Sequence, residues 1–182
     1  MVGVAHGNEA RVKELVELKP QLVNAWWDWG FGDWESPLGA SSHVGHRGIA
    51  EFLLSKGARI DIFAAAMLGM TEVVKAFVAA SPGVQRAYGP HSITLLAHAK
   101  AGGEKAKATV EYLESLGDAG NPPLAVQPLA DDKALAYVGQ YRFGPGPNDI
   151  FEVKFEKSQL TILRPGGSAR RLVLTTHEHE FF

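Results

Sequence analysis

Apolar residues recur three and four positions apart over the first two thirds of the chain, and they alternate with polar residues in the last third. The first spacing places apolar side chains on one face of a helix, and the second places them on one face of a strand. Phe151, Val153 and Phe155, for example, fall on one face of a strand whose other face is mostly polar. We therefore predict an α+β multidomain fold, with an all-helical domain over residues 1–117 and a small antiparallel β domain over residues 132–182.

A Pro-rich segment, residues 118–131, separates the two predicted domains. Pro122 and Pro123 are adjacent, and Pro128 follows them. Adjacent prolines are excluded from helix interiors because each lacks the amide hydrogen and restricts the residue before it. We predict that this segment is a linker. Further on, Lys157 and Ser158 stand between two alternating stretches, where a tight hairpin turn is expected.

The helical part repeats one pattern four times. A short Ala-rich stretch leads into a glycine, and a few polar residues then lead into a longer helical pattern. A short helix, a turn and a longer helix form a unit that cannot bury its inner face alone, so such units must stack. The glycines that mark the turns are Gly7, Gly45, Gly69 and Gly102.

This pattern resembles the ankyrin repeat over about residues 4–117. The most similar stretch is SPLGASSHVGH at residues 36–46, followed by IAEFLLSKGARID. The resemblance implies an α-solenoid of about four helix-turn-helix repeats whose concave face binds a partner. Two features depart from the family pattern. Gly39 stands where the motif has histidine, and the glycines are 38, 24 and 33 residues apart, where the family repeat is about 33.

The 38-residue step contains an insertion that holds all four tryptophans of the chain within nine residues. Tryptophans contribute strongly to interfaces because they bury a large rigid area. We interpret the insertion as an aromatic finger at the edge of the concave face, although the same residues would equally serve as a packing plug that docks the β domain. The binding function predicts a protein or peptide partner, or a small apolar ligand, on the finger and on inner helix positions. The expected binding residues are Trp26, Trp27, Trp29, Phe31, Trp34, His43, Met67, His91 and Lys100.

An enzymatic alternative depends on the acidic residues of the finger and on histidines that the repeat does not explain. A histidine paired with a carboxylate in an aromatic-walled cleft suits general acid–base catalysis, because histidine titrates near neutral pH. The function would be that of a hydrolase or lyase acting on a small apolar substrate. The candidate catalytic residues are Asp33, Glu35, His43, His91 and His98. The sequence leaves open whether the protein is an enzyme.

Metal and cofactor motifs are absent from the sequence pattern. The helical part contains no HxxxH or HExxH spacing, so no metal site is predicted there. His177 and His179 alternate near the C-terminus, where solvated polar residues are the simpler interpretation. Gly144-Pro145-Gly146-Pro147 fits a turn without the lysine of a phosphate loop. We predict no cofactor.

Composition narrows the function further. The 182 residues carry a formal net charge of −2, which gives no general attraction to nucleic acid or to anionic membranes. No apolar run approaches the roughly 20 residues that span a bilayer, and the first residues lack the pattern of a secretory signal. The chain contains no cysteine, which is compatible with a reducing cytoplasm. A cytoplasmic location is therefore predicted.

The C-terminal part resembles a second family. The stretches VGQY at residues 138–141, QLTI at 159–162 and EFF at 180–182 are similar to the small β-rich, lipocalin-like domain appended to class C β-lactamase-like serine hydrolases. The resemblance brings no catalytic residues with it. It implies an incomplete sheet here, whose exposed edge is expected to allow a homodimer to form by strand pairing.

Overall fold

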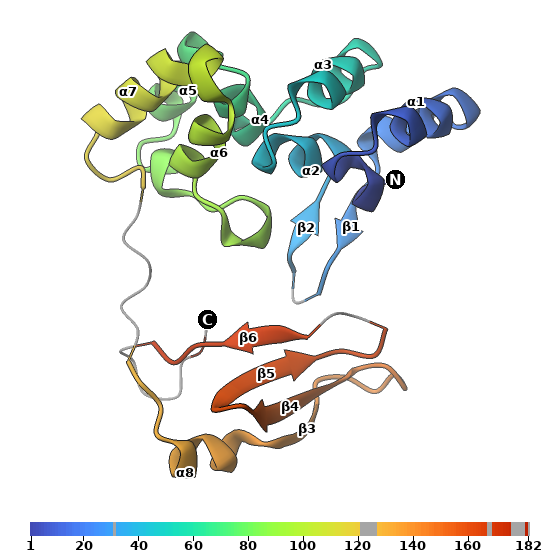
Figure 1. Cartoon of the computed structure of the whole chain (residues 1–182), viewed down its shortest axis with the longest axis vertical. Coiled ribbons are helices and arrows are strands. Elements are labelled where there is room, and N and C mark those ends of the chain that lie inside the picture. Colours follow the sequence, from blue (N-terminus) through green and yellow to red (C-terminus); the bar gives the residue numbers. More distant parts are fainter. Residues whose placement is uncertain (31, 121–126, 167–168, 176–180, 182) are drawn as a thin grey trace. The chain divides into compact units, whose positions relative to one another are not determined.

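The protein is α+β, as predicted, and divides into two compact units, residues 1–121 and residues 122–182 (Figure 1). The computed structural model describes residues 1–30, 32–120, 127–166, 169–175 and 181. The division lies within the Pro-rich segment. None of the helices in these described ranges is long and apolar enough to cross a membrane.

Unit 1 is built from four pairs of a short and a longer helix. The short helices pack on one another in chain order, and they are η1 (Gly3–His6), α2 (Pro37–His43), α4 (Ile62–Met67) and α6 (Leu95–Ala101). The longer helices are α1 (Glu9–Leu18), α3 (Arg47–Ser55), α5 (Thr71–Ala80) and α7 (Lys107–Ser115). Short 3₁₀ turns complete the unit, and they are η2 (Pro20–Asn24), η3 (Val84–Arg86), η4 (Pro90–Ser92) and η5 (Gly103–Ala106).

Side-chain caps set where three of the four short helices begin. The hydroxyl of Ser36 accepts a hydrogen bond from the amide of Gly39, and Asp61 and Thr94 cap α4 and α6 in the same way. Such caps satisfy amides that have no partner inside the helix. His46 caps α3, because its Nδ1 accepts from the amide of Ile49 at 3.3 Å.

Small residues let the short helices approach closely. Two hydrophobic clusters form the core of unit 1, and alanines of α2, α4 and α6 are fully buried in them. Larger side chains such as Leu53 and Leu113 come from the longer helices and fill the remaining space. The core thereby fixes the spacing of the short helices, whose ends carry the candidate site.

The Trp-rich insertion folds as a two-stranded hairpin that projects beyond α2 (Figure 1). Strand β1 (Trp27–Asp28) pairs with β2 (Trp34–Glu35), with Trp27 opposite Glu35. The carboxylate of Asp28 accepts from the amide of Gly30 at 2.7 Å and so closes the turn. Strand β2 runs directly into the cap of α2, so the hairpin is fixed to the helical core at this end.

Unit 2 is a four-stranded antiparallel sheet in the order β3-β4-β5-β6. The strands are β3 (Gly139–Arg142), β4 (Ile150–Glu156), β5 (Gln159–Leu163) and β6 (Arg170–Leu172), and they follow the short helices α8 (Asp131–Ala134) and η6 (Leu135–Tyr137). The predicted turn at Lys157 and Ser158 is confirmed, since both residues adopt positive φ between paired β4 and β5. Val153, Leu160 and Ile162 form the core with Ala134.

The small antiparallel β unit predicted for the C-terminal part is present, and the sheet formed by its described strands is open and is not a closed barrel. Closed barrels that enclose a filled interior have about eight strands. Four strands of three to seven residues are too few to curl round and meet. The edges of this sheet are β3 and β6.

Candidate functional site

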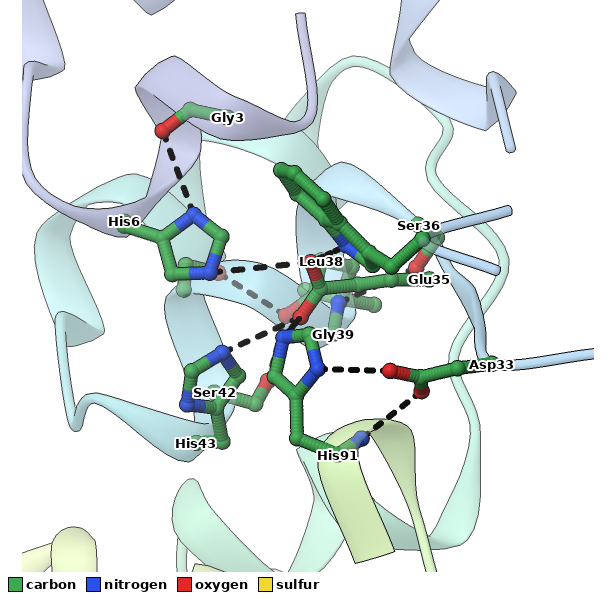
Figure 2. Close-up of polar contacts among 12 residues, drawn as sticks. Gly3, His6, Asp33, Glu35, Ser36, Leu38, Gly39, Ser42, His43 and His91 are labelled. Atoms are coloured by element: carbon green, nitrogen blue, oxygen red, sulfur yellow. Dashed lines mark hydrogen bonds and ion pairs between the residues drawn. The ribbon is translucent and has the colours of Figure 1, made fainter. Parts of the chain in front are cut away.

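The carboxylate of Glu35 is fully buried and lies among three imidazoles (Figure 2). The Nε2 atoms of His43 and His91 are 3.0 and 3.5 Å from Oε1 of Glu35, and Nε2 of His6 is 3.6 Å from Oε2. The indole of Trp29 donates a hydrogen bond to Oε2 at 2.7 Å. Burying a carboxylate is costly unless charged or hydrogen-bonding groups surround it, and this carboxylate has four such neighbours.

These residues come from four separate segments. His6 ends η1, His43 ends α2 and Glu35 ends β2. His91 lies in η4, where its backbone adopts φ of +58°, a conformation that is uncommon for residues other than glycine. Packing of the short helices on one another and on the hairpin therefore assembles the cluster. No short stretch of the chain contains it.

Two of the imidazoles are held from behind through Nδ1. The carboxylate of Asp33 accepts from both the backbone amide of His91, at 2.8 Å, and its Nδ1, at 2.7 Å. The Nδ1 of His6 lies 3.1 Å from the carbonyl oxygen of Gly3, to which it donates. Because both Nδ1 atoms donate, each neutral ring presents an Nε2 lone pair to Glu35.

Two buried atoms at the centre have no hydrogen-bond partner among the described residues. They are Oε1 of Glu35 and Nε2 of His43, which are close to one another without the geometry of a hydrogen bond. Buried polar atoms in folded proteins are almost always satisfied by a protein group, a water or an ion. The centre of the cluster therefore suits a small polar or ionic occupant.

The cluster also has the composition of a metal site. One ligand atom from each of His6, Glu35, His43 and His91 can be chosen so that all four lie within 4.8 Å of one another. The sequence predicts no metal site because a search for local spacing detects only ligands that share a helix or a turn. Here every ligand comes from a different segment.

The tryptophans divide into two groups. Trp29 belongs to the cluster, with its ring 6.1 Å from that of His6 and 5.9 Å from that of His91. Trp26, Trp27 and Trp34 are each 56% exposed, so these three do not serve as a buried plug within unit 1. Phe31 lies outside the described residues.

A cavity of about 280 Å³ lies beside the cluster. Its wall includes four aromatic side chains, those of Trp26, Trp34, Phe63 and Tyr88. Asp33 belongs both to this wall and to the cluster, since it holds His91. Asp61 also lines the cavity, and burial raises its pKa above the ordinary value.

Other expected site residues lie elsewhere. Met67 is fully buried in the hydrophobic core, so it offers no surface to a partner. Lys100 is exposed and pairs with Glu114 at 2.9 Å. His6 was not among the predicted site residues. Its position next to Ala5, at the inner end of the first short helix, could have identified it from the sequence.

His98 is fully buried behind His43, with the two ring centres 6.4 Å apart. Its Nδ1 donates to the carbonyl oxygen of Thr94 at 2.9 Å, and no contact with Glu35 joins it to the cluster. Burial lowers the pKa of His98 from 6.5 to about 4. His98 is therefore neutral at physiological pH.

This pKa predicts a loss of stability in acid. The unfolded chain binds a proton at His98 below pH 6.5 and the folded chain does so only below about pH 4. As the pH is lowered from 6.5 to about 4, the free energy of unfolding therefore decreases, and protonation of His98 accounts for about 3 kcal/mol of the decrease. Urea unfolding at several pH values is expected to show a correspondingly shallower fall for His98→Leu. Parallel pH dependences in the two proteins would contradict the assignment.

Comparison with known proteins does not assign a function to this chain. The chain matches no protein-family model and no curated protein.

Proposed function

We propose that unit 1 is a hydrolase that acts on a small apolar ester or amide. The supporting observation is the pair formed by His91 and Asp33, whose carboxylate contacts both the ring and the backbone of the histidine. A carboxylate behind a histidine fixes its tautomer and stabilises the imidazolium that forms when the ring accepts a proton. Both residues are among the candidate catalytic residues named from the sequence.

In the proposed reaction, Nε2 of His91 removes a proton from a water molecule. The resulting hydroxide attacks the acyl carbon, and the leaving group takes the proton back from Nε2 as its bond to that carbon breaks. His91 is 31% exposed in its side chain, so water reaches the ring. Asp33 remains ionised throughout and holds the ring in place.

The adjoining cavity supports an apolar substrate. Its aromatic wall would bury a small ring or a short aliphatic group, and Asp33 and Pro90 place the wall next to His91. Burial of apolar area contributes about 25 cal/mol per Å², which is enough to hold a small group near the reacting atoms. We further propose that the four helix pairs are ankyrin-like repeats stacked as a solenoid, which supply a rigid frame for the site.

A test uses p-nitrophenyl butyrate and p-nitrophenyl benzoate as probes. The protein is expected to hydrolyse at least one of them above the buffer rate, and Asp33→Asn is expected to lower kcat at least about 100-fold. His46→Asn is the matched control, because it removes an imidazole outside the cluster and keeps an N-cap side chain. Rates equal to buffer, or an Asp33→Asn rate equal to that of the unaltered protein, would refute the hydrolase.

The three exposed tryptophans favour a second function, which is binding of a protein or peptide on the hairpin. Trp26, Trp27 and Trp34 offer a rigid apolar surface of the kind that dominates interfaces. The same probes separate the two functions. A binding module leaves the esters intact in every variant, whereas the hydrolase turns them over.

A further inference from the structure

We infer that His6, Glu35, His43 and His91 bind one divalent transition-metal ion of the zinc class. This inference deepens the proposed function, on whose site it rests, because it supplies that site with a cofactor. If the ion is present, Nε2 of His91 would be a ligand. The water that attacks the acyl carbon would then be activated by the metal in place of His91.

The separations of the ligand atoms fit a shared ion. The three imidazole nitrogens lie 3.0 to 3.6 Å from oxygens of Glu35. Zinc lies about 2.0 to 2.1 Å from nitrogen and oxygen ligands, so ligands at the corners of a tetrahedron are about 3.3 to 3.4 Å apart. One ligand atom from each of the four residues lies within 4.8 Å of the others, so the atoms must approach one another by up to about 1.5 Å for all four to share one ion.

The hydrogen bonds around the cluster leave lone pairs facing one another. The Nδ1 of His6 must donate because its partner is a carbonyl oxygen, and the Nδ1 of His91 donates to the carboxylate of Asp33. Both Nε2 lone pairs then face the oxygens of Glu35, and lone pairs repel unless a cation lies between them. That cation is either a metal ion or protons on the rings.

The two unsatisfied atoms favour the metal ion over protons. Nε2 of His43 lies 3.0 Å from Oε1 of Glu35, yet a proton on this nitrogen would not make a hydrogen bond to the oxygen, because the two groups lack hydrogen-bond geometry. Side-chain exposure is 10% for His43 and zero for Glu35, so bulk water does not satisfy either atom. A central ion is coordinated along lone-pair directions and satisfies both atoms at once.

The outer contacts are those that metal ligands usually have. A metal-bound histidine commonly donates its other nitrogen to a carboxylate or a backbone carbonyl. Asp33 supplies the first arrangement to His91, and Gly3 supplies the second to His6. The indole of Trp29 holds the second oxygen of Glu35. These contacts orient the ligands before the ion arrives.

The donor set selects the class of metal. Three imidazoles and one carboxylate suit zinc and its neighbours cobalt and nickel, whereas magnesium and calcium prefer oxygen ligands. The site is closed on one side by His43 and Glu35. The side chains of His6 and His91 are 29% and 31% exposed, which leaves a route for the ion and a place for a bound water.

The test uses the full chain, stripped with a chelator and titrated with zinc chloride in a calorimeter. We expect one zinc per chain and a Kd below about 1 µM. Glu35→Gln, His43→Asn and His6→Asn are each expected to weaken binding more than about 100-fold, and Asp33→Asn about 10- to 100-fold. Cobalt chloride should produce visible d–d absorption in the unaltered protein and not in Glu35→Gln.

Two controls separate this site from other histidines. His46→Asn and the double variant His177→Asn/His179→Asn are expected to bind zinc with unaltered affinity and stoichiometry. Circular dichroism establishes that each variant is folded. His6→Asn carries the test if Glu35→Gln fails to fold, because His6 is partly exposed in a short 3₁₀ helix. Absence of stoichiometric binding, or retained binding in folded His6→Asn and His43→Asn, would overturn the inference.

Failure of the metal site and failure of the hydrolase give different results. Zinc binding without ester hydrolysis would leave the metal site standing and refute the hydrolase. Hydrolysis by chelator-treated protein that binds no zinc would retain His91 as the base and refute the metal site. Hydrolysis that is lost with the chelator and restored by zinc supports both.

Discussion

Zinc is expected to stabilise unit 1 against unfolding by about 4 kcal/mol when free zinc is about 1,000 times the dissociation constant. An ion that binds the folded protein and not the unfolded chain shifts the folding equilibrium by mass action. The gain should be large here because the ligands come from three distant stretches of the chain, so unfolding disperses them. One stretch holds His6, the second holds Glu35 and His43, and the third holds His91.

Tryptophan fluorescence during guanidinium unfolding measures this effect, because all four tryptophans lie in residues 26–34 and report on unit 1. The unfolding midpoint should rise with zinc and return to its starting value with a chelator. Magnesium at the same concentration serves as the control and should leave the midpoint unchanged. A midpoint that zinc does not move, or that magnesium moves equally, would contradict the zinc site.

The helical pairs and the sheet were predictable because each depends on local periodicity. Glycines followed by helical apolar spacing located the four pairs, and alternation located β4 and β5. The form of the β unit was less predictable, and its described strands make an open sheet and not a closed barrel. Local sequence patterns therefore predict the helices and strands well, but they do not predict whether a sheet closes into a barrel.

The candidate site was predictable in part. Asp33, Glu35, His43 and His91 were named as candidate residues, and the structure brings them together. His98 was also named but lies behind His43, and His6 was missed. Helical spacing says which face a residue occupies, but the convergence of four segments depends on how the short helices stack.

Strand β2 shows why the site was hard to anticipate. Polarity alone would bury Trp34 and expose Glu35, since tryptophan is apolar and glutamate is charged. The structure has the reverse, with Trp34 56% exposed and Glu35 fully buried. An inversion of this kind costs stability, and it is typical of a functional site where local preference is overridden.

Because the helix pairs stack closely, a substitution in the turn before α5 is expected to cause a large loss of stability. Gly69 has φ of +73°, and a Cβ atom there would overlap the carbonyl oxygen of Lys105, which lies in η5 after α6. Gly69→Ala is therefore expected to lower the free energy of unfolding by about 3 to 5 kcal/mol, because backbone strain and a clash with neighbouring backbone combine.

Gly57→Ala is the matched control for this effect. Gly57 has φ of +88°, but a Cβ atom there meets nothing within 4 Å. Its substitution carries only the strain of the left-handed backbone, about 1 kcal/mol. The difference between the two variants in urea unfolding, with unchanged dependence on urea, measures how tightly the turn at Gly69 is packed on η5. Equal losses of stability in the two variants would show that the turn at Gly69 adjusts to the added methyl group. The close packing that positions the short helices, and with them His43 and His91, would then not be rigid.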